Sequence, residues 1–186
     1  MNRSSLHNMY FIAVVCPPEL DKKLLGYKLW MKEKFGCVVA LKSPAHVTLV
    51  PPFWLNEEKE KELLAVFRNF SSDMAEIVIE LNGFSYFGKR VLFANVVVNP
   101  ALEELQQQVE SYFVESFPAQ IRNDERPFHP HITIATRDMK PSAFEKAWEV
   151  FSNKELVESF SVKNIYILKL SSGRWEVIAG RYWSEM

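Results

Sequence analysis

The chain has 186 residues, of which 48% are hydrophobic and 24% are charged, and its formal net charge at pH 7 is -1. This length and composition are typical of a globular protein with a substantial core. A charge close to zero argues against a protein that grips long stretches of nucleic acid, because neutralising many phosphates needs a strongly basic surface. It leaves room for a small basic site that binds one nucleotide or a terminal phosphate.

The first half of the chain alternates strand-like and helix-like segments. In chain order we expect a strand over 9–16, a helix from Pro17-Pro18 to Gly36, a strand from His46 that Pro51-Pro52 break, a helix over 56–70 and a strand over 76–81. The first helix has apolar residues at helical spacing, which are Leu20, Leu24, Tyr27, Met31 and Phe35.

The second half repeats this order. It predicts a strand over 91–98, a helix from Pro100, a strand from His131, a helix over 141–151, a strand over 159–170 and a hairpin through Ser172-Gly173 to a strand over 174–183. Pro18 precedes His46 by 28 residues, and Pro100 precedes His131 by 31. We therefore expect one domain over 1–186, built from two similar lobes (9–85 and 91–186) that an approximate twofold axis relates.

Two of the three threonines of this chain stand two residues after a histidine, in His46-Val47-Thr48-Leu49 and His131-Ile132-Thr133-Ile134. Side chains alternate between the two faces of a strand, so each motif presents an imidazole and a hydroxyl on one face and two aliphatic groups on the other. Across the twofold axis the two motif strands would face each other. One cleft would then hold two titratable rings and two hydroxyl donors.

Two imidazoles suit general acid-base chemistry near pH 7, with one ring accepting a proton while the other donates one. Two hydroxyls suit the binding of phosphate oxygens between the rings. Neither motif contains a carboxylate, and no nucleophile completes a Ser-His-Asp or Cys-His arrangement. The pattern predicts attack of water on phosphorus without a metal, a cofactor or a covalent enzyme intermediate.

With these motifs the sequence resembles the 2H phosphoesterases, which are named for two H-x-[ST]-h motifs in which h is apolar. The segment from Arg126 to Ala135 is similar to the second motif of the RNA 2′,3′-cyclic phosphodiesterases, also called 2′-5′ RNA ligase-like proteins. The resemblance implies an α+β, bilobal fold in which two antiparallel sheets, flanked by helices, enclose a central cleft.

The resemblance also implies an activity. His46 and His131 would be the catalytic pair, and Thr48 and Thr133 would bind the phosphate. The enzyme would hydrolyse a 2′,3′-cyclic phosphate, on an RNA end or a nucleotide, to a 2′-phosphate, with reversible 2′-5′ RNA ligase activity as a further expectation. By analogy His131 would activate water and His46 would protonate the leaving 3′ oxygen, although the sequence itself does not assign these two roles.

Three further residues are candidates for substrate binding. Arg137 shares the strand parity of His131 and Thr133, if the strand continues unbroken to it. His129 lies two residues before His131 and is expected either to orient the site or to pack under Pro130. Phe53 follows the first motif, with Trp54 next to it, and such aromatic residues could stack on a base, although at least one of the two is expected to pack in the core.

Two alternatives compete with this interpretation. His129 and His131 have the spacing of two metal ligands on a strand, but the sequence offers no clear third or fourth ligand. The scaffold could also bind a nucleotide or an RNA end without turning it over. Retention of both histidines favours an enzyme, because simple binding does not need two proton-transfer groups.

The remaining features indicate a cytoplasmic protein. Cys16 and Cys37 form no metal or redox motif, and two reduced buried thiols are expected rather than a disulfide. The apolar run over 10–16 is too short to span a membrane and lacks a cleavage site, so no membrane partner is expected. The sequence does not determine the oligomeric state or the natural substrate.

Overall fold

The structure is a computed structural model that describes residues 6–122 and 126–184. Within these ranges the chain forms eight strands, four α-helices and two short 3₁₀-helices. In chain order they are β1 (His7–Val15), α1 (Pro18–Phe35), η1 (Val39–Lys42), β2 (His46–Asn56), η2 (Glu57–Lys59), α2 (Glu60–Asn69), β3 (Ile77–Phe87), β4 (Val91–Val96), α3 (Pro100–Ser116), β5 (His131–Ala135), α4 (Pro141–Phe151), β6 (Val157–Val162), β7 (Asn164–Ser171) and β8 (Arg174–Tyr182).

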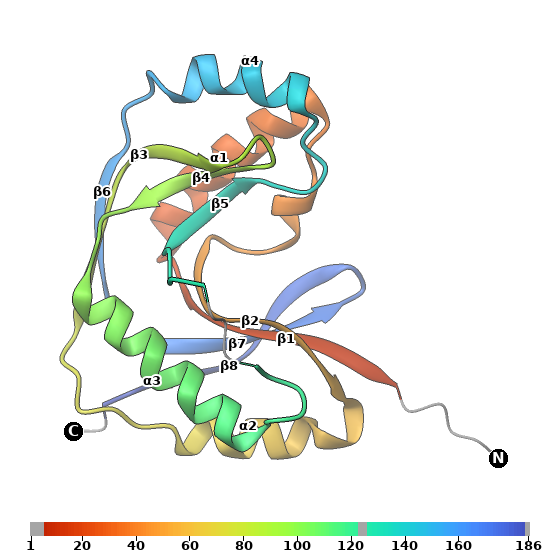
Figure 1. Cartoon of the computed structure of the whole chain (residues 1–186), viewed down its shortest axis with the longest axis vertical. Helices are drawn as coiled ribbons and strands as arrows, with labels where there is room; N and C mark the ends of the chain where they lie inside the picture. Colours follow the sequence, from red (N-terminus) through yellow and green to blue (C-terminus); the bar gives the residue numbers. More distant parts are fainter. Residues whose placement is uncertain (1–5, 123–125, 185–186) are drawn as a thin grey trace.

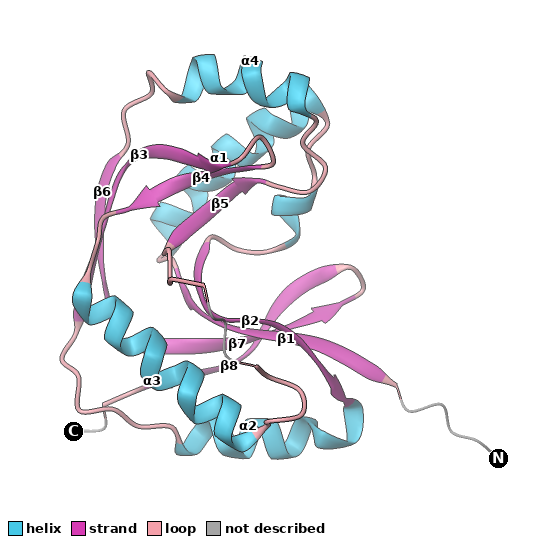
Figure 2. Cartoon of the chain, in the orientation of Figure 1, coloured by secondary structure: helices cyan, strands magenta, loops and turns pink. Residues whose placement is uncertain are grey.

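The strands of the described ranges form two antiparallel sheets of four strands each, with corresponding strand order (Figures 1 and 2). One sheet has the order β2-β1-β7-β8, and the other has the order β5-β4-β3-β6. β2 and β5, which carry the two motifs, occupy equivalent edges and contact each other. This is the predicted bilobal α+β fold with two pseudo-twofold-related sheets.

The lobes differ from the predicted division into residues 9–85 and 91–186. β3 comes from the first half but pairs with β4 and β6, whereas β7 comes from the second half and pairs with β1. The helices are exchanged in the same way, because α1 packs against β5 and α3 packs against β2. Figure 1 shows α1 and α4 with the upper sheet, and α2 and α3 with the lower one. Periodicity predicts which face of an element is buried, but not which sheet it joins.

The prediction that Pro51-Pro52 break the first motif strand is wrong. Val50 pairs with Ile12 and Phe53 pairs with Tyr10, so β2 carries one extra residue and forms a bulge at the two prolines. β2 is the edge strand of its sheet. An edge strand tolerates proline, because one side of the strand makes no ladder hydrogen bonds.

Two other strand boundaries differ from prediction. The expected strand over 159–170 is split into β6 and β7, which belong to different sheets, so the chain passes between the lobes at Lys163. β3 continues past residue 81 to Phe87, with an irregular register around Gly83, whose φ is 69°. The predicted hairpin between β7 and β8 is confirmed. Ser172 (φ 50°) and Gly173 (φ 79°) both have the positive φ that its tight turn requires.

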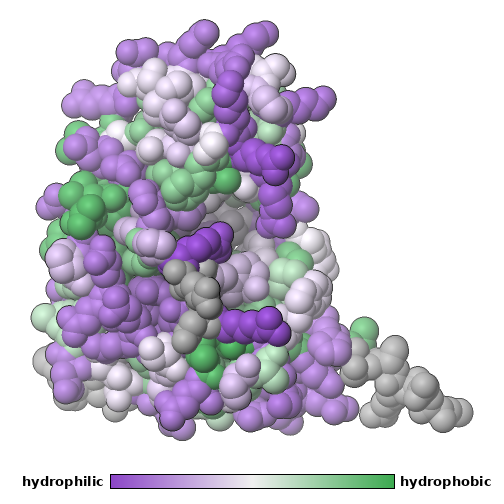
Figure 3. Space-filling view, viewed as in Figure 1, coloured by the Kyte–Doolittle hydropathy of each residue, from purple (hydrophilic) through white to green (hydrophobic). Residues whose placement is uncertain are grey.

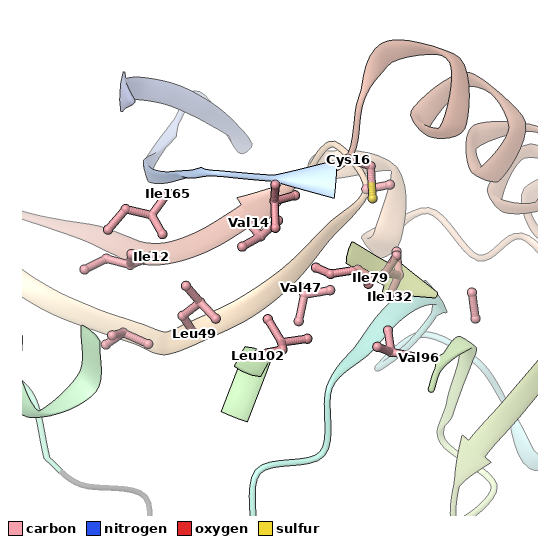
Figure 4. Packing of buried hydrophobic residues seen from close by; sticks show 14 of the residues in the cluster. Ile12, Val14, Cys16, Val47, Leu49, Ile79, Val96, Leu102, Ile132 and Ile165 are labelled. Carbon is pink, nitrogen blue, oxygen red and sulfur yellow. The ribbon is translucent and has the colours of Figure 1, made fainter. Parts of the chain in front are cut away.

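One hydrophobic cluster contains buried residues from both sheets and from all four described α-helices. Figure 4 shows the side chains of Val47, Leu49 and Ile132, from the two motif strands, within this cluster. These motif residues are at most 1% exposed: Val47, Leu49, Ile132 and Ile134. Burying a side chain of this size contributes about 1.5–3 kcal/mol, so the apolar half of each motif anchors its strand. The polar half remains partly exposed, as the alternation predicts.

The surface in the view of Figure 3 is mainly hydrophilic, with hydrophobic residues in small separate patches. Such patches are normal for a globular surface and do not by themselves indicate an interface. Among the helices that the structure describes, none is long and apolar enough to cross a membrane.

Candidate active site

The two motif histidines are held in the same way. Nδ1 of His46 lies 2.7 Å from the carbonyl oxygen of Pro44, and Nδ1 of His131 lies 2.8 Å from the carbonyl oxygen of His129. A carbonyl only accepts hydrogen bonds, so Nδ1 of each ring carries the proton and donates it. In the neutral form, Nε2 of each ring is then free to accept a proton from a ligand in the cleft.

Each histidine ring packs on a phenylalanine of the neighbouring strand. The ring centroids of Phe11 and His46 are 4.7 Å apart, and those of Phe93 and His131 are 5.0 Å apart. These contacts restrict each imidazole from the side and support its orientation. Neither phenylalanine was predicted from the sequence. The spacing of the two repeats could have identified them, because Phe11 precedes Pro18 and Phe93 precedes Pro100 by the same seven residues.

The motif side chains line two cavities that share Thr48. The first cavity, of about 440 Å³, contains Thr48, His131 and His129 in its wall. The second, of about 380 Å³, is lined by Thr48, His46 and Thr133. The structure therefore places the four motif residues in the walls of two cavities that have Thr48 in common.

Arg137 lines the second cavity, but not for the predicted reason. β5 ends at Ala135, so strand parity does not extend to this residue. Arg137 instead occupies a tight turn with φ 21°, which few residues other than glycine adopt. The carboxylate of Asp138 accepts hydrogen bonds from the backbone N–H groups of Val38 (2.6 Å) and Val39 (3.0 Å), which fixes this turn against η1.

The two other candidates have different positions. His129 lines the first cavity, and its carbonyl group accepts the hydrogen bond from Nδ1 of His131. Phe53 is only 5% exposed and stacks on Tyr10, and neither cavity includes it in its wall. Besides Phe11, the wall of the cavity that contains His46 and Thr48 includes a second aromatic residue, Trp175 of β8. Nothing in its local sequence indicated this position.

Burial disfavours the protonated form of both histidines. Loss of solvent lowers the pKa of His46 to about 4, against the opposing effect of its hydrogen bond to Pro44, and the charges of Lys28 and His131 lower it further. Burial also lowers the pKa of His131, against the opposing effect of its hydrogen bond to His129. Both rings are therefore neutral at pH 7 in the absence of a ligand.

We expect this burial to make the protein sensitive to acid. The unfolded His46 binds a proton below pH 6.5, whereas the folded ring does so only below about pH 4. Between these values the unfolded state binds more protons, so stability falls as the pH falls through this window. Urea unfolding at pH 7 and pH 5 should show that wild type loses about 2 kcal/mol more than the variant His46→Asn. Equal losses would mean that the ring is not desolvated.

The described residues offer no group of three or more His, Cys, Asp and Glu side chains placed to hold a metal ion. The Nδ1 atom of His131 is occupied by its hydrogen bond to the His129 carbonyl. Cys16 and Cys37 are both buried and free, as predicted.

Comparison with known proteins identifies the family of this chain. The model of the 2′-5′ RNA ligase superfamily matches residues 18–174. A protein of Geobacillus kaustophilus (strain HTA426) named "Putative phosphoesterase" is 26% identical over 172 residues, which cover 91% of this chain and 93% of that one.

Solved structures share the fold. E. coli LigT complexed with 3′-AMP superposes with a TM-score of 0.68 at 20% identity, covering 97% of this chain and all of that one. TT0787 of Thermus thermophilus superposes with a TM-score of 0.64 at 20% identity, covering 94% and 97% of the two chains. The chain belongs to the 2′-5′ RNA ligase superfamily of 2H phosphoesterases.

Proposed function

We propose that this protein is a phosphodiesterase that hydrolyses a 2′,3′-cyclic phosphate to a 2′-phosphate with His46 and His131 as its acid-base pair. The observation that carries the proposal is the matched geometry of the two rings, each fixed at Nδ1 and free at Nε2. One Nε2 takes the proton of the attacking water as its oxygen bonds to phosphorus. The other, protonated, gives its proton to O3′ as the bond between phosphorus and O3′ breaks.

The two threonines support the placement of the phosphate. Thr48 lies in the walls of both cavities, and Thr133 lines the wall of the cavity that contains His46. Hydroxyl donors at these positions would bind the non-bridging oxygens and stabilise the charge that develops on them. Lys42 and Arg137, which line the same cavity, add positive charge for an anionic substrate.

The walls around this point suit a nucleoside. The indole of Trp175 packs edge-on against Phe11, with ring centroids 4.6 Å apart, and is partly exposed to the cavity that holds His46 and Thr48. An exposed aromatic face beside a phosphate site is suited to stacking on a base. The solved LigT structures with 3′-AMP and with ATP share this fold, which supports a nucleotide or an RNA end as the ligand.

A binding module without turnover is the second candidate, and one assay separates the two. Purified protein is incubated with each 2′,3′-cyclic mononucleotide, with and without EDTA, and the products are resolved by chromatography. We expect a 2′-phosphate product and no effect of EDTA. Tight binding without product would favour the module. Activity that EDTA abolishes and zinc or manganese restores would favour a metal mechanism. Incubating RNA ends that carry a 2′,3′-cyclic phosphate and a 5′-hydroxyl tests the ligase activity.

We expect a bell-shaped dependence of kcat/KM on pH with its optimum below 6.5, because burial lowers the pKa of both rings in the free enzyme. A bound phosphate anion favours a charged imidazole, so the bell in kcat should lie at higher pH than the bell in kcat/KM. Both limits belong to the coupled pair of rings. Initial rates from pH 4 to 9 test this expectation, and a rate that rises to a plateau would contradict it.

A further inference from the structure

The loop before β2 is anchored at each of its three residues, 43–45. Nζ of Lys28 donates a hydrogen bond to the carbonyl of Ser43 (3.1 Å), and the backbone N–H of Ala45 donates one to the carboxylate of Asp21 (2.6 Å). The carbonyl of Pro44, between them, accepts the hydrogen bond from His46. Two side chains of α1 therefore hold the backbone that orients the imidazole.

Lys28 is an unusual residue for this task, because it is only 3% exposed. Lysine is almost never fully buried without a partner, since its charge loses the solvation of water. Burial lowers the pKa of Lys28, while the negative charge of Asp21 opposes that shift. A neutral side chain would fill this place at lower cost in stability, which indicates that the charge has a use.

We propose that Lys28 is a positioning residue for His46, which fixes the carbonyl of Ser43 and places a buried positive charge near the imidazole, so that this ring stays neutral and ready to accept a proton. His46 would then act as the base, which reverses the roles that the family resemblance implies for the two rings. The proposal rests on the catalytic role proposed for His46. Other charged groups also face this ring. They are Asp21 of α1, His131 of β5, and Lys42 and Arg137 in the wall of the same cavity.

The charge would also distinguish two histidines that the pseudo-twofold axis makes equivalent. Lys28 stands ten residues after Pro18, and the residue ten places after Pro100 is Glu110. Glu110 lies in the wall of the cavity that contains His131. Corresponding positions of α1 and α3 thus have opposite charges. A symmetric pair of rings becomes asymmetric in its affinity for a proton, as a reaction with one acid and one base requires.

The test is an NMR titration of the histidine ring signals in the ligand-free protein, with each signal assigned by single substitution. In Lys28→Met we expect the pKa of His46 to rise by about one pH unit and that of His131 to change much less. Lys28→Arg keeps the charge and should keep the wild-type titration. Lys28→Gln keeps a hydrogen-bond donor without the charge and should titrate like Lys28→Met. Lys32→Met, an exposed lysine one turn further along α1, is the matched control and should change nothing.

A folded Lys28→Met or Lys28→Gln protein in which His46 titrates as in wild type would overturn the proposal. If Lys28→Met does not fold, the comparison of Lys28→Gln with Lys28→Arg decides the matter. The titration needs no substrate, so a wild-type protein without cyclic phosphodiesterase activity would count against the proposed function and not against this electrostatic role. With activity present, the pH profile of kcat/KM should move upward in both Lys28→Met and Lys28→Gln and stay in place in Lys28→Arg, which separates the effect of the charge from that of packing.

Discussion

Replacing either His46 or His131 by alanine should lower kcat/KM for a 2′,3′-cyclic phosphate by about 10²–10⁴-fold, the usual contribution of one positioned acid or base. Each ring is fixed by its own carbonyl partner and its own phenylalanine, so neither ring can substitute for the other. Because both act in the same step, the double variant should lose less than the product of the two single losses.

The matched control for this experiment is His129→Ala. The ring of His129 lines the cavity, but the carbonyl group that orients His131 belongs to the backbone and survives the substitution. We expect less than about a tenfold loss, because no proton transfer depends on this ring. Near-normal turnover by a folded His46→Ala or His131→Ala protein would refute the acid-base assignment.

The second large effect is expected at the threonines. Thr48→Val and Thr133→Val keep the shape of the side chain and remove its hydroxyl, so each should lower kcat/KM by about 10–10²-fold. This is the value of one hydrogen bond to a charged group, about 1.5–3 kcal/mol. Of the two, Thr48 should matter more, because it lines both cavities.

Thr48→Ser is the control, because it keeps the hydroxyl and loses only a methyl group. It should retain most of the activity, and so should Thr133→Ser. The measurements are kcat and KM together with circular dichroism to confirm folding. If the valine and serine variants were equally active, the hydroxyls would have no role in binding phosphate.

Much of this structure could be predicted from sequence because its signals are local. The alternation in His46-Val47-Thr48-Leu49 requires only that a strand have one buried face, and Gly36 ends α1 with the positive φ (72°) that glycine favours. The order of the elements likewise follows from periodicity and turn residues read along the chain. These features depend on neighbours within a few residues.

The features that could not be predicted are those that depend on distant partners. Whether β3 joins β4 or β1 is settled by hydrogen bonding and packing across the whole molecule, which periodicity does not describe. Trp175 reaches the cleft because β8 pairs with β7, which in turn pairs with β1. The sequence gives no sign that Lys28 is buried. Its burial depends on the contact between α1 and the loop before β2, which is distant along the chain.

The exchange of elements between the lobes has a consequence for how the chain folds as it is made. β1 pairs with β7, and α1 packs on β5, which begins 96 residues after α1 ends at Phe35. A growing chain therefore cannot complete either sheet until β6, which begins at Val157, has left the ribosome. Pairings between such distant segments form slowly and leave apolar strand edges exposed meanwhile. We therefore expect nascent chains of this protein to be prone to aggregation until β6, β7 and β8 have been synthesised and the two sheets can close.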